Sequence, residues 1–285
     1  MTSTDRGMEN QLKRWFRSLP LARWLLRRRR ARKADVYLLS FPKVGRTWLR
    51  VMIGALLAEH YGHPELAAGE LGEDMQRFPG VPRVKVKHDG GPHRRTPDEI
   101  APDKSEFADT KVILMVRDLR DTTVSNYFQA TRREGAFHGD MAAWLVEPRG
   151  SVASMLRYYS VWAAQRHVPK QLLLVRYEDL KADTARELRR IAGFLGMQDV
   201  SDATIAAAVE HGSFSRMRER EASRPADGTP FAAGKEGDPE SFKTRKGAVG
   251  GYVEYLTPEQ VAWLEQKIRD EMDPWYGYRP GKGRA

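Results

Sequence analysis

A run of basic and small residues at positions 40–48, with the sequence SFPKVGRTW, could bind a phosphate-like anion. It follows a short apolar run typical of a buried strand, and the periodic apolar residues after it predict a helix from Thr47 to about His60. Backbone N–H groups at a helix start attract an anion, and Gly45 lets the backbone approach that anion closely. Lys43 adds a positive charge and Thr47 a hydroxyl donor. The alternative is an ordinary turn between strand and helix with basic residues on the surface.

Two further runs carry similar chemistry. Arg117 and Ser125 lie in VRDLRDTTVS, directly after a strongly apolar run at 111–116. Arginine offers a planar fork suited to phosphate, and a hydroxyl on the following helix can join it. The third run, FKTRKGAVG, contains Arg245, Lys246 and Gly247. The alternatives are that the charges after 111–116 pair with one another, and that the third run is a basic surface loop.

In their order along the chain, these runs resemble the sulfotransferase family that uses 3′-phosphoadenosine-5′-phosphosulfate (PAPS). The first run resembles the family's 5′-phosphosulfate-binding loop, [FY]-P-K-S-G-[TS]-T-W, with Val44 in place of Ser and Arg46 in place of Thr. The second is similar to the 3′-phosphate-binding segment, and the third to the R-K-G-x-x-G element that closes over that phosphate. The resemblance covers most of residues 36–272. It implies PAPS as the sulfuryl donor, adenosine 3′,5′-bisphosphate (PAP) as its product, and no metal.

The resemblance also implies which residues bind the donor. They are Lys43, Val44, Gly45, Arg46, Thr47, Trp48, Arg117, Ser125, Tyr177, Phe214, Arg245, Lys246 and Gly247. Tyr177, in the run YEDL, would lie beside the adenine, with Phe214 on one face of the ring and Trp48 on the other. Each of these aromatic residues, taken alone, is more often part of a core than of a ligand site.

Transfer to a hydroxyl needs a general base, and histidine suits neutral pH. Of seven histidines, only His88 directly follows an expected strand, at 84–87, and this segment resembles the family's K-[TS]-H. The catalytic residues are therefore predicted to be His88, as the base, and Lys43, which would stabilise charge on the departing oxygen. The family's lysine before the histidine could be Lys85 or Lys87. The alternative for His88 is a structural hydrogen bond.

These residues must be positioned by a sheet whose strands end at one edge. Strands separated by helices predict an α/β domain with a parallel sheet covered on both faces. The resemblance implies that residues 35–285 form this single domain with the sulfotransferase fold and its P-loop-like phosphosulfate loop. The expected strands are 36–40, 84–87, 111–116 and 172–175. The expected helices are 47–60, about 120–132, 151–166, 183–195, 202–210 and a last one opening at Thr257-Pro258. The charged residues 218–243, with several Gly and Pro, predict a mobile loop.

Most of the net charge lies in an N-terminal arm. Residues 1–34 contain eleven Lys and Arg and two Asp and Glu, so they carry a net charge of +9 out of the total of +10. Because the rest of the chain is nearly neutral, the high net charge does not indicate nucleic-acid binding. Within residues 10–33, Trp and Leu recur at helical spacing between the bases, as in helices that lie on an anionic membrane surface. The alternatives are a helix packed on the domain and a basic tail. The expected location is the cytoplasm, peripheral to the inner face of the membrane.

Two other classes of protein compete with this interpretation. A P-loop-like nucleotide kinase or NTPase would also bind phosphates, but the first run lacks G-x-x-x-x-G-K-[ST], the pattern that places Mg²⁺. A membrane-binding or nucleic-acid-binding protein would use the basic arm, whereas residues 35–285 are nearly neutral. The chain contains no cysteine, which excludes thiolate chemistry and disulfides.

The acceptor depends on segments expected to line its pocket, 130–150 and 218–243. The arm favours a glycolipid or another hydroxyl presented by a membrane, followed by a small alcohol or phenol. An amine acceptor and the oligomeric state stay open.

Overall fold

A four-stranded parallel sheet forms the centre of the computed structural model, which describes residues 34–68, 71–223, 234 and 237–278. Its order is β2-β1-β3-β4, and every neighbouring pair is parallel. The strands are β1 (Val36–Ser40), β2 (Val84–Lys87), β3 (Lys111–Val116) and β4 (Gln171–Arg176). All four expected strands are confirmed, and only β4 differs, extending one residue further at each end.

The burial of the strands explains their sequences. Every residue of β1 and all but the first of β3 are buried, because these two central strands have helices on both faces. The edge strands β2 and β4 are only partly buried, and β2 alternates Val and Lys. Continuous apolar runs at the centre of a parallel sheet are what two covered faces require.

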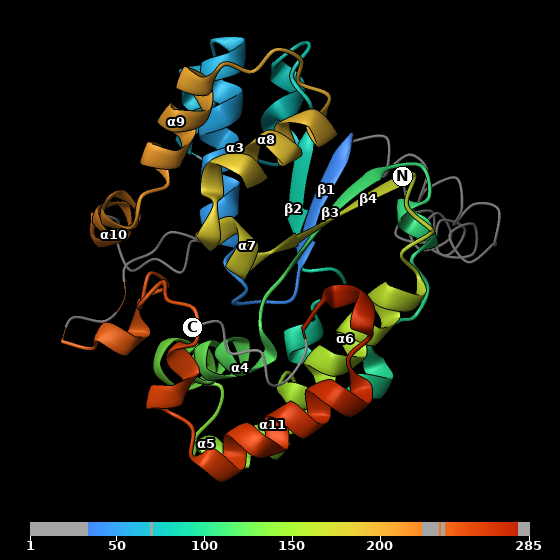
Figure 1. The fold of residues 1–285 in the computed structure, drawn as a ribbon, viewed down its shortest axis with the longest axis vertical. Helices are drawn as coiled ribbons and strands as arrows, with labels where there is room; N and C mark the ends of the chain where they lie inside the picture. Colours follow the sequence, from blue (N-terminus) through green and yellow to red (C-terminus); the bar gives the residue numbers. More distant parts are fainter. Residues whose placement is uncertain (1–33, 69–70, 224–233, 235–236, 279–285) are drawn as a thin grey trace, which may run out of the picture.

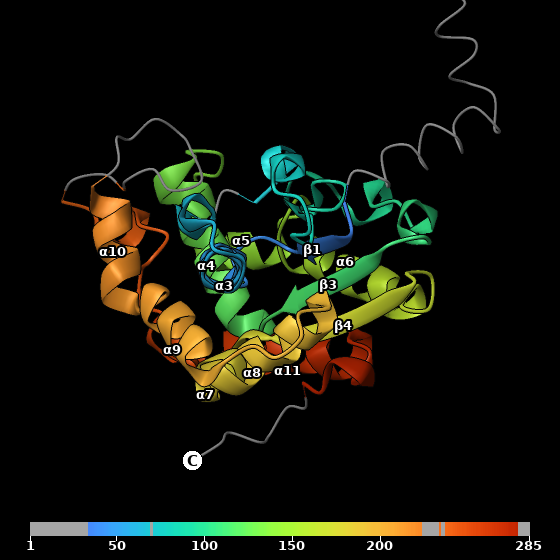
Figure 2. The same ribbon diagram turned by 90° about the horizontal axis from the view of Figure 1, so that it is seen from above.

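Helices cover both faces of the sheet. Figure 1 shows one group on one side of the strands, made of α3 (Arg46–Tyr61), α7 (Tyr177–Ala182), α8 (Thr184–Leu195) and α9 (Asp202–His211). The second group lies on the other side and is made of α4 (Leu119–Phe128), α5 (Met141–Val146), α6 (Val152–Ala164) and α11 (Pro258–Glu271). Figure 2 shows the same arrangement from above. In α6, Tyr158, Tyr159 and Trp162 are fully buried and fill the core beneath the sheet.

Short helical turns connect these elements. The 3₁₀ helices are Pro64–Ala68, Glu73–Arg77, Pro92–Arg94, Pro97–Glu99, Ser105–Phe107, Pro239–Ser241, Gly251–Glu254 and Pro274–Tyr276. A π-helical turn, Gln129–Arg133, directly continues α4. The last helix begins as predicted, because Thr257 and Gln260 form a reciprocal capping box around Pro258.

The expectation of a loop from 218 to 243 is wrong over its first residues. The helix α10 (Phe214–Ala222) runs through them. Ser213 caps this helix by accepting a hydrogen bond from the N–H of Arg216, and Met217 and Glu221, one turn apart, both face inward and are buried. Charged residues surround these two buried positions, so the helical spacing is not visible in the sequence. Residues 224–233 and 235–236 lie outside the described residues.

Residues 1–33, and with them the amphipathic pattern predicted for 10–33, lie outside the described residues. Among the helices that the structure describes, none is long and apolar enough to cross a membrane.

Candidate active site

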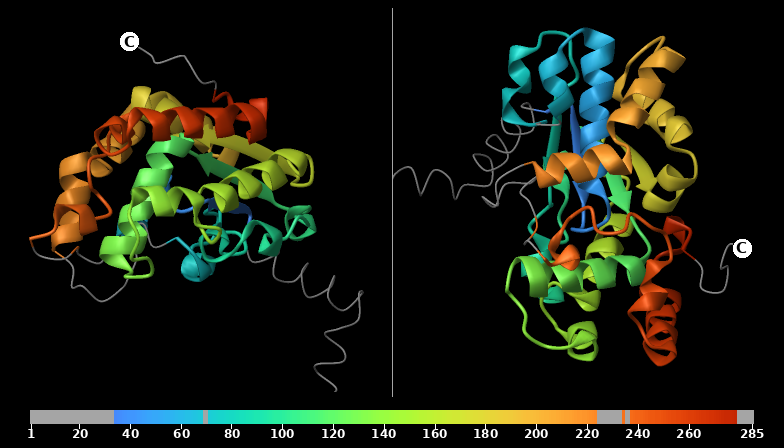
Figure 3. Two further views of the ribbon diagram at one scale, coloured as in Figure 1. Left: turned by 90° about the horizontal axis from the view of Figure 1, so that it is seen from below. Right: turned by 90° about the vertical axis from the view of Figure 1, so that its left-hand side faces the viewer.

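The predicted site residues come together because all four strands point the same way. The segment Phe41–Thr47 follows β1, His88 follows β2, Arg117 follows β3 and Tyr177 follows β4. The strand register places Leu39 opposite Lys87, Ser40 opposite Met115, and Val116 opposite Arg176, so the strands end almost level. Figure 3 shows this edge between the two groups of helices. Ligands of parallel α/β proteins bind at this edge.

The loop after β1 leaves the start of α3 open to an anion. Gly45 caps the helix with φ +94°, and neither a capping side chain nor an acidic residue in the first turn is present there. A Cβ atom on Gly45 would lie 2.6 Å from Cδ2 of Tyr177, so a larger residue fits neither the backbone nor the space. Lys43 is itself left-handed at φ +67°. Val44 is fully buried in the core, so only its backbone is available to a ligand.

Lys43 carries an unusual ammonium group. Its Nζ donates a hydrogen bond to Oε1 of Gln129, 2.9 Å away in the π-helical turn. Burial, together with the positive charges of Lys243 and Arg133, lowers the pKa of Lys43 to about 7. Lys43 is therefore close to the midpoint of its titration near neutral pH.

His88 is held with its two ring nitrogens in different roles. Nδ1 lies 3.0 Å from the carbonyl oxygen of Ser40, and Nε2 lies 2.7 Å from NH2 of Arg46. Because a carbonyl only accepts, Nδ1 bears the proton, and the lone pair of Nε2 accepts from the guanidinium. Burial, together with the positive charge of Arg46, lowers the pKa of His88 to about 3. The imidazole is therefore neutral, with Nε2 as its basic atom.

Arg117 joins the second and third basic runs. Its guanidinium stacks 4.4 Å from the ring centroid of Tyr177, and NH2 donates to the carbonyl of Ala248 at 2.8 Å. It also forms an ion pair with buried Asp121 at 3.4 Å, and Asp121 accepts hydrogen bonds from the N–H groups of Gly250 and Tyr252. The expected alternative, pairing within the run, is therefore present as well. It does not use the whole side chain, because Nε of Arg117 is buried without a partner among the described residues.

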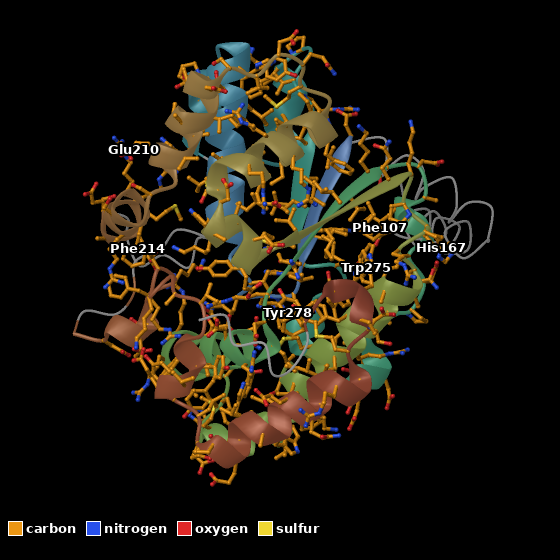
Figure 4. All side chains as sticks on the ribbon, in the orientation of Figure 1. Phe107, His167, Glu210, Phe214, Trp275 and Tyr278 are labelled. Atoms are coloured by element: carbon orange, nitrogen blue, oxygen red, sulfur yellow. The ribbon has the colours of Figure 1, made fainter. Side chains whose placement is uncertain are left out.

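The third run lies beside Phe214. A Cβ atom on Gly247, whose φ is +63°, would lie 3.0 Å from Cδ2 of Phe214, which is 47% exposed (Figure 4). Arg245 donates to Glu240 and to the hydroxyl of Tyr255, and Lys246 pairs with Glu254. The two basic side chains are thus held by exchangeable partners next to an exposed aromatic ring.

The three expected adenine contacts share one neighbourhood. The rings of Trp48 and Tyr177 meet edge to face at 5.7 Å, and Nε1 of Trp48 donates to the carbonyl of Gly212 at 2.7 Å. Gly212 lies two residues before Phe214. Thr47 is partly buried in the first turn of α3, and Ser125 is partly buried in the second half of α4.

Sequence reasoning missed several residues that hold the site together. Gln129 receives the hydrogen bond of Lys43, and buried Glu221 accepts the backbone N–H groups of Lys243 and Thr244. Gln129 and Glu221 lie in none of the three runs, whereas Asp121 lies within the second. Lys87, one of the two lysines left open, donates to Glu106 and lies over the rings of Tyr37 and Phe107.

A family model described as "Sulfotransferase domain" matches residues 33–275 of this chain. The chain belongs to the sulfotransferase family. This confirms the expectation of a PAPS-dependent sulfotransferase with the α/β fold of that family. Among curated relatives, it is 26% identical over 266 residues to cytosolic sulfotransferase 17 of Arabidopsis thaliana, which covers 85% of this chain and 75% of the relative. It is 25% identical over 263 residues to sulfotransferase 2A1 of Rattus norvegicus, covering 87% and 86%.

Solved structures share the fold of this sulfotransferase. A mouse sulfotransferase complexed with PAP superposes with a TM-score of 0.60 at 22% identity, covering 84% of this chain and 85% of the other. Retinol dehydratase in complex with androsterone and PAP superposes with a TM-score of 0.58 at 19% identity, covering 83% and 80%. In the part of the chain that the structure describes, no group of three or more His, Asp or Glu could hold a metal ion.

Proposed function

We propose that this chain transfers the sulfuryl group of PAPS to an acceptor hydroxyl by in-line displacement, with His88 as the general base. The observation that carries the proposal is the neutral imidazole of His88, whose basic Nε2 faces the same edge of the sheet as the open start of α3. Family membership supports the reaction class, and two neighbouring structures, the mouse sulfotransferase and retinol dehydratase, are complexes with PAP.

The donor fits the basic groups of the site. The 5′-phosphosulfate would lie against the N–H groups of the loop and of α3, beside Lys43 and Thr47. The 3′-phosphate would lie between Arg117, Ser125 and the third run, where Arg245 and Lys246 would exchange their present carboxylate partners for it. Nε of Arg117 is buried and has no partner within the described part of the chain, which supports this placement because a buried donor without an acceptor is costly. The adenine would lie among Trp48, Tyr177 and Phe214.

The reaction requires one bond to form and one to break. The acceptor oxygen forms a bond to sulfur as the bond between sulfur and the bridging oxygen of the 5′-phosphate breaks. The acceptor proton passes to Nε2 of His88, while the ammonium group of Lys43 stabilises the negative charge that develops on the departing oxygen. No other co-reactant is consumed. The remaining contribution of the protein is alignment of the two oxygens.

For the acceptor, we propose a glycolipid or another hydroxyl presented by a membrane, with a small alcohol or phenol as the second class. The basic pattern of residues 10–33 supports the first. The second is supported by two neighbouring structures of retinol dehydratase, which are complexes with androsterone and with retinol. The corresponding location is the cytoplasm, with the arm at the inner face of the membrane.

Calorimetric titration with PAP tests the donor site, and ATP with Mg²⁺ serves as the control. We expect PAP to bind and ATP to bind weakly or not at all. If the chain binds ATP and fails to bind PAP, the result would instead favour the kinase alternative.

The variant His88→Ala tests the base, and we expect it to lose sulfuryl transfer while it keeps its affinity for PAP. Retained transfer would remove His88 from this role.

A further inference from the structure

Arg46 occupies a place where the family loop usually has Thr, and its guanidinium faces the base. It is the first residue of α3, one residue after Gly45. NH2 donates to Nε2 of His88 at 2.7 Å, whereas NH1 is buried and has no hydrogen-bond partner among the described residues. Burial lowers the pKa of Arg46 to about 10, so the group is still charged at neutral pH. A buried cation with an unused donor beside a base requires an explanation.

The surroundings of His88 hold other unused polar atoms. Ser40, whose carbonyl accepts from the imidazole, leaves its hydroxyl buried and unpartnered in the described structure. The ring of His93 lies 5.4 Å from that of His88, and its Nδ1 is likewise buried and unpartnered. Polar atoms that are buried without partners indicate space for a polar ligand or an ordered water. The surroundings of Arg46 and His88 therefore offer hydrogen-bonding atoms to a polar ligand group.

The expected reaction geometry indicates which polar group this is. An acceptor oxygen bound to the base lies about 3 Å from Nε2, and the attacked sulfur lies about 3 Å beyond that oxygen. The oxygens around the sulfur then lie beside the base, within reach of a guanidinium that already contacts it. Arginine binds such tetrahedral oxyanions through its fork of N–H donors.

We propose that Arg46 is a catalytic residue that binds a non-bridging oxygen of the transferring sulfuryl group. The acceptor hydroxyl then replaces the guanidinium of Arg46 as the partner of Nε2 of His88. The proposal rests on the function proposed above. In the transfer, the acceptor oxygen bonds to sulfur, the bond from sulfur to the bridging oxygen breaks, and the proton moves to His88. Arg46 keeps its charge throughout and stabilises the sulfuryl oxygens. At this position, the charged guanidinium of Arg46, with two NH2 groups as donors, replaces a hydroxyl of the family loop.

The same placement affects the proton of the base. The groups that face His88 are Arg46 from α3, the carbonyl of Ser40 from β1, His93 from the 3₁₀ helix Pro92–Arg94, and Lys243 from the third run. Two of these carry positive charge, and they oppose protonation of the imidazole. Removing the charge of Arg46 is therefore expected to raise the pKa of His88.

The test compares PAPS with PAP, because only PAPS carries the sulfuryl group. Binding of both is measured by calorimetry, without acceptor, for the full-length wild type, Arg46→Thr, Arg46→Lys and the control Arg186→Thr. Arg186 lies on α8 with a side chain that is 63% exposed. We expect Arg46→Thr to lose tenfold or more in PAPS affinity and less than twofold in PAP affinity, Arg46→Lys to lose less, and the control to match the wild type.

Three outcomes would overturn the inference. Equal losses of PAPS and PAP affinity would place Arg46 on the 5′-phosphate, and unchanged affinity for both would leave it a structural role. An acid limb of the kcat/KM profile that does not move to higher pH in Arg46→Thr would contradict its effect on His88. A variant that melts far below the wild type is replaced by Arg46→Gln, to which the same criteria apply. If the wild type itself fails to bind PAP, the proposed function fails rather than the role of Arg46.

Discussion

PAP binding is expected to draw a proton from solution onto Lys43. Burial, with the charges of Lys243 and Arg133, lowers the pKa of this ammonium to about 7. At pH 8 only about a tenth of the molecules then carry the charge. A bound 5′-phosphate stabilises the charged form and restores a pKa near the ordinary value, because an opposite charge within contact distance offsets the burial. Binding at pH 8 therefore takes up about 0.9 proton.

The sign of the pH dependence follows from this uptake. Because the complex holds more protons than the separate partners, PAP affinity falls as pH rises above the pKa of free Lys43. Each pH unit between about 8 and 10 weakens binding about tenfold, which is about 1.4 kcal/mol. Lys243, whose pKa burial lowers to about 8, adds a smaller uptake if it also contacts the ligand.

Calorimetry in two buffers of different ionisation enthalpy measures the number of protons directly. The matched control is Lys43→Arg, whose guanidinium keeps its charge at pH 8 and cannot take up this proton. We expect the buffer dependence to fall by about 0.9 proton in this variant, with thermal melting used to check that it is folded. An uptake below about a third of a proton in the wild type, or the same uptake in Lys43→Arg, would refute the placement of the phosphate on Lys43.

Three further changes test the frame around the donor. Gly45→Ala should weaken PAP binding and lower the free energy of unfolding by clearly more than the about 1–2 kcal/mol that a left-handed backbone alone costs. The control is Gly196→Ala, because Gly196 has φ +85° but open space around its Cβ position. Equal losses of stability in urea unfolding would contradict the clash with Tyr177. Asp121→Asn should lower the free energy of unfolding by about 1–3 kcal/mol, because it leaves a backbone N–H without an acceptor, and it should also reduce PAP affinity. Unchanged PAP affinity would show that Asp121 does not support the donor site. Lys246→Ala should weaken PAP binding with little change in stability, since its present ion pair is exposed; unchanged affinity would remove the third run from the donor site.

Local sequence patterns predicted most of the elements. The runs at 36–40 and 111–116 are apolar throughout because both faces of a central parallel strand are covered, and such runs are visible without any tertiary contact. The capping box at Thr257 is equally local. The helix α10 was missed because its buried residues, Met217 and Glu221, are separated by charged residues and one of them is itself acidic.

The sequence by itself determined the family, the sheet and the residues that follow each strand, because loop motifs and strand patterns are written in consecutive positions. Only the tertiary structure decided what those residues contact. The hydrogen bonds from Lys43 to Gln129 and from Arg46 to His88 join residues 86 and 42 positions apart. Buried Asp121 binds backbone N–H groups 129 and 131 positions away. Such contacts depend on how the strands and helices pack, and burial at that meeting point sets the proton affinities of Lys43 and His88.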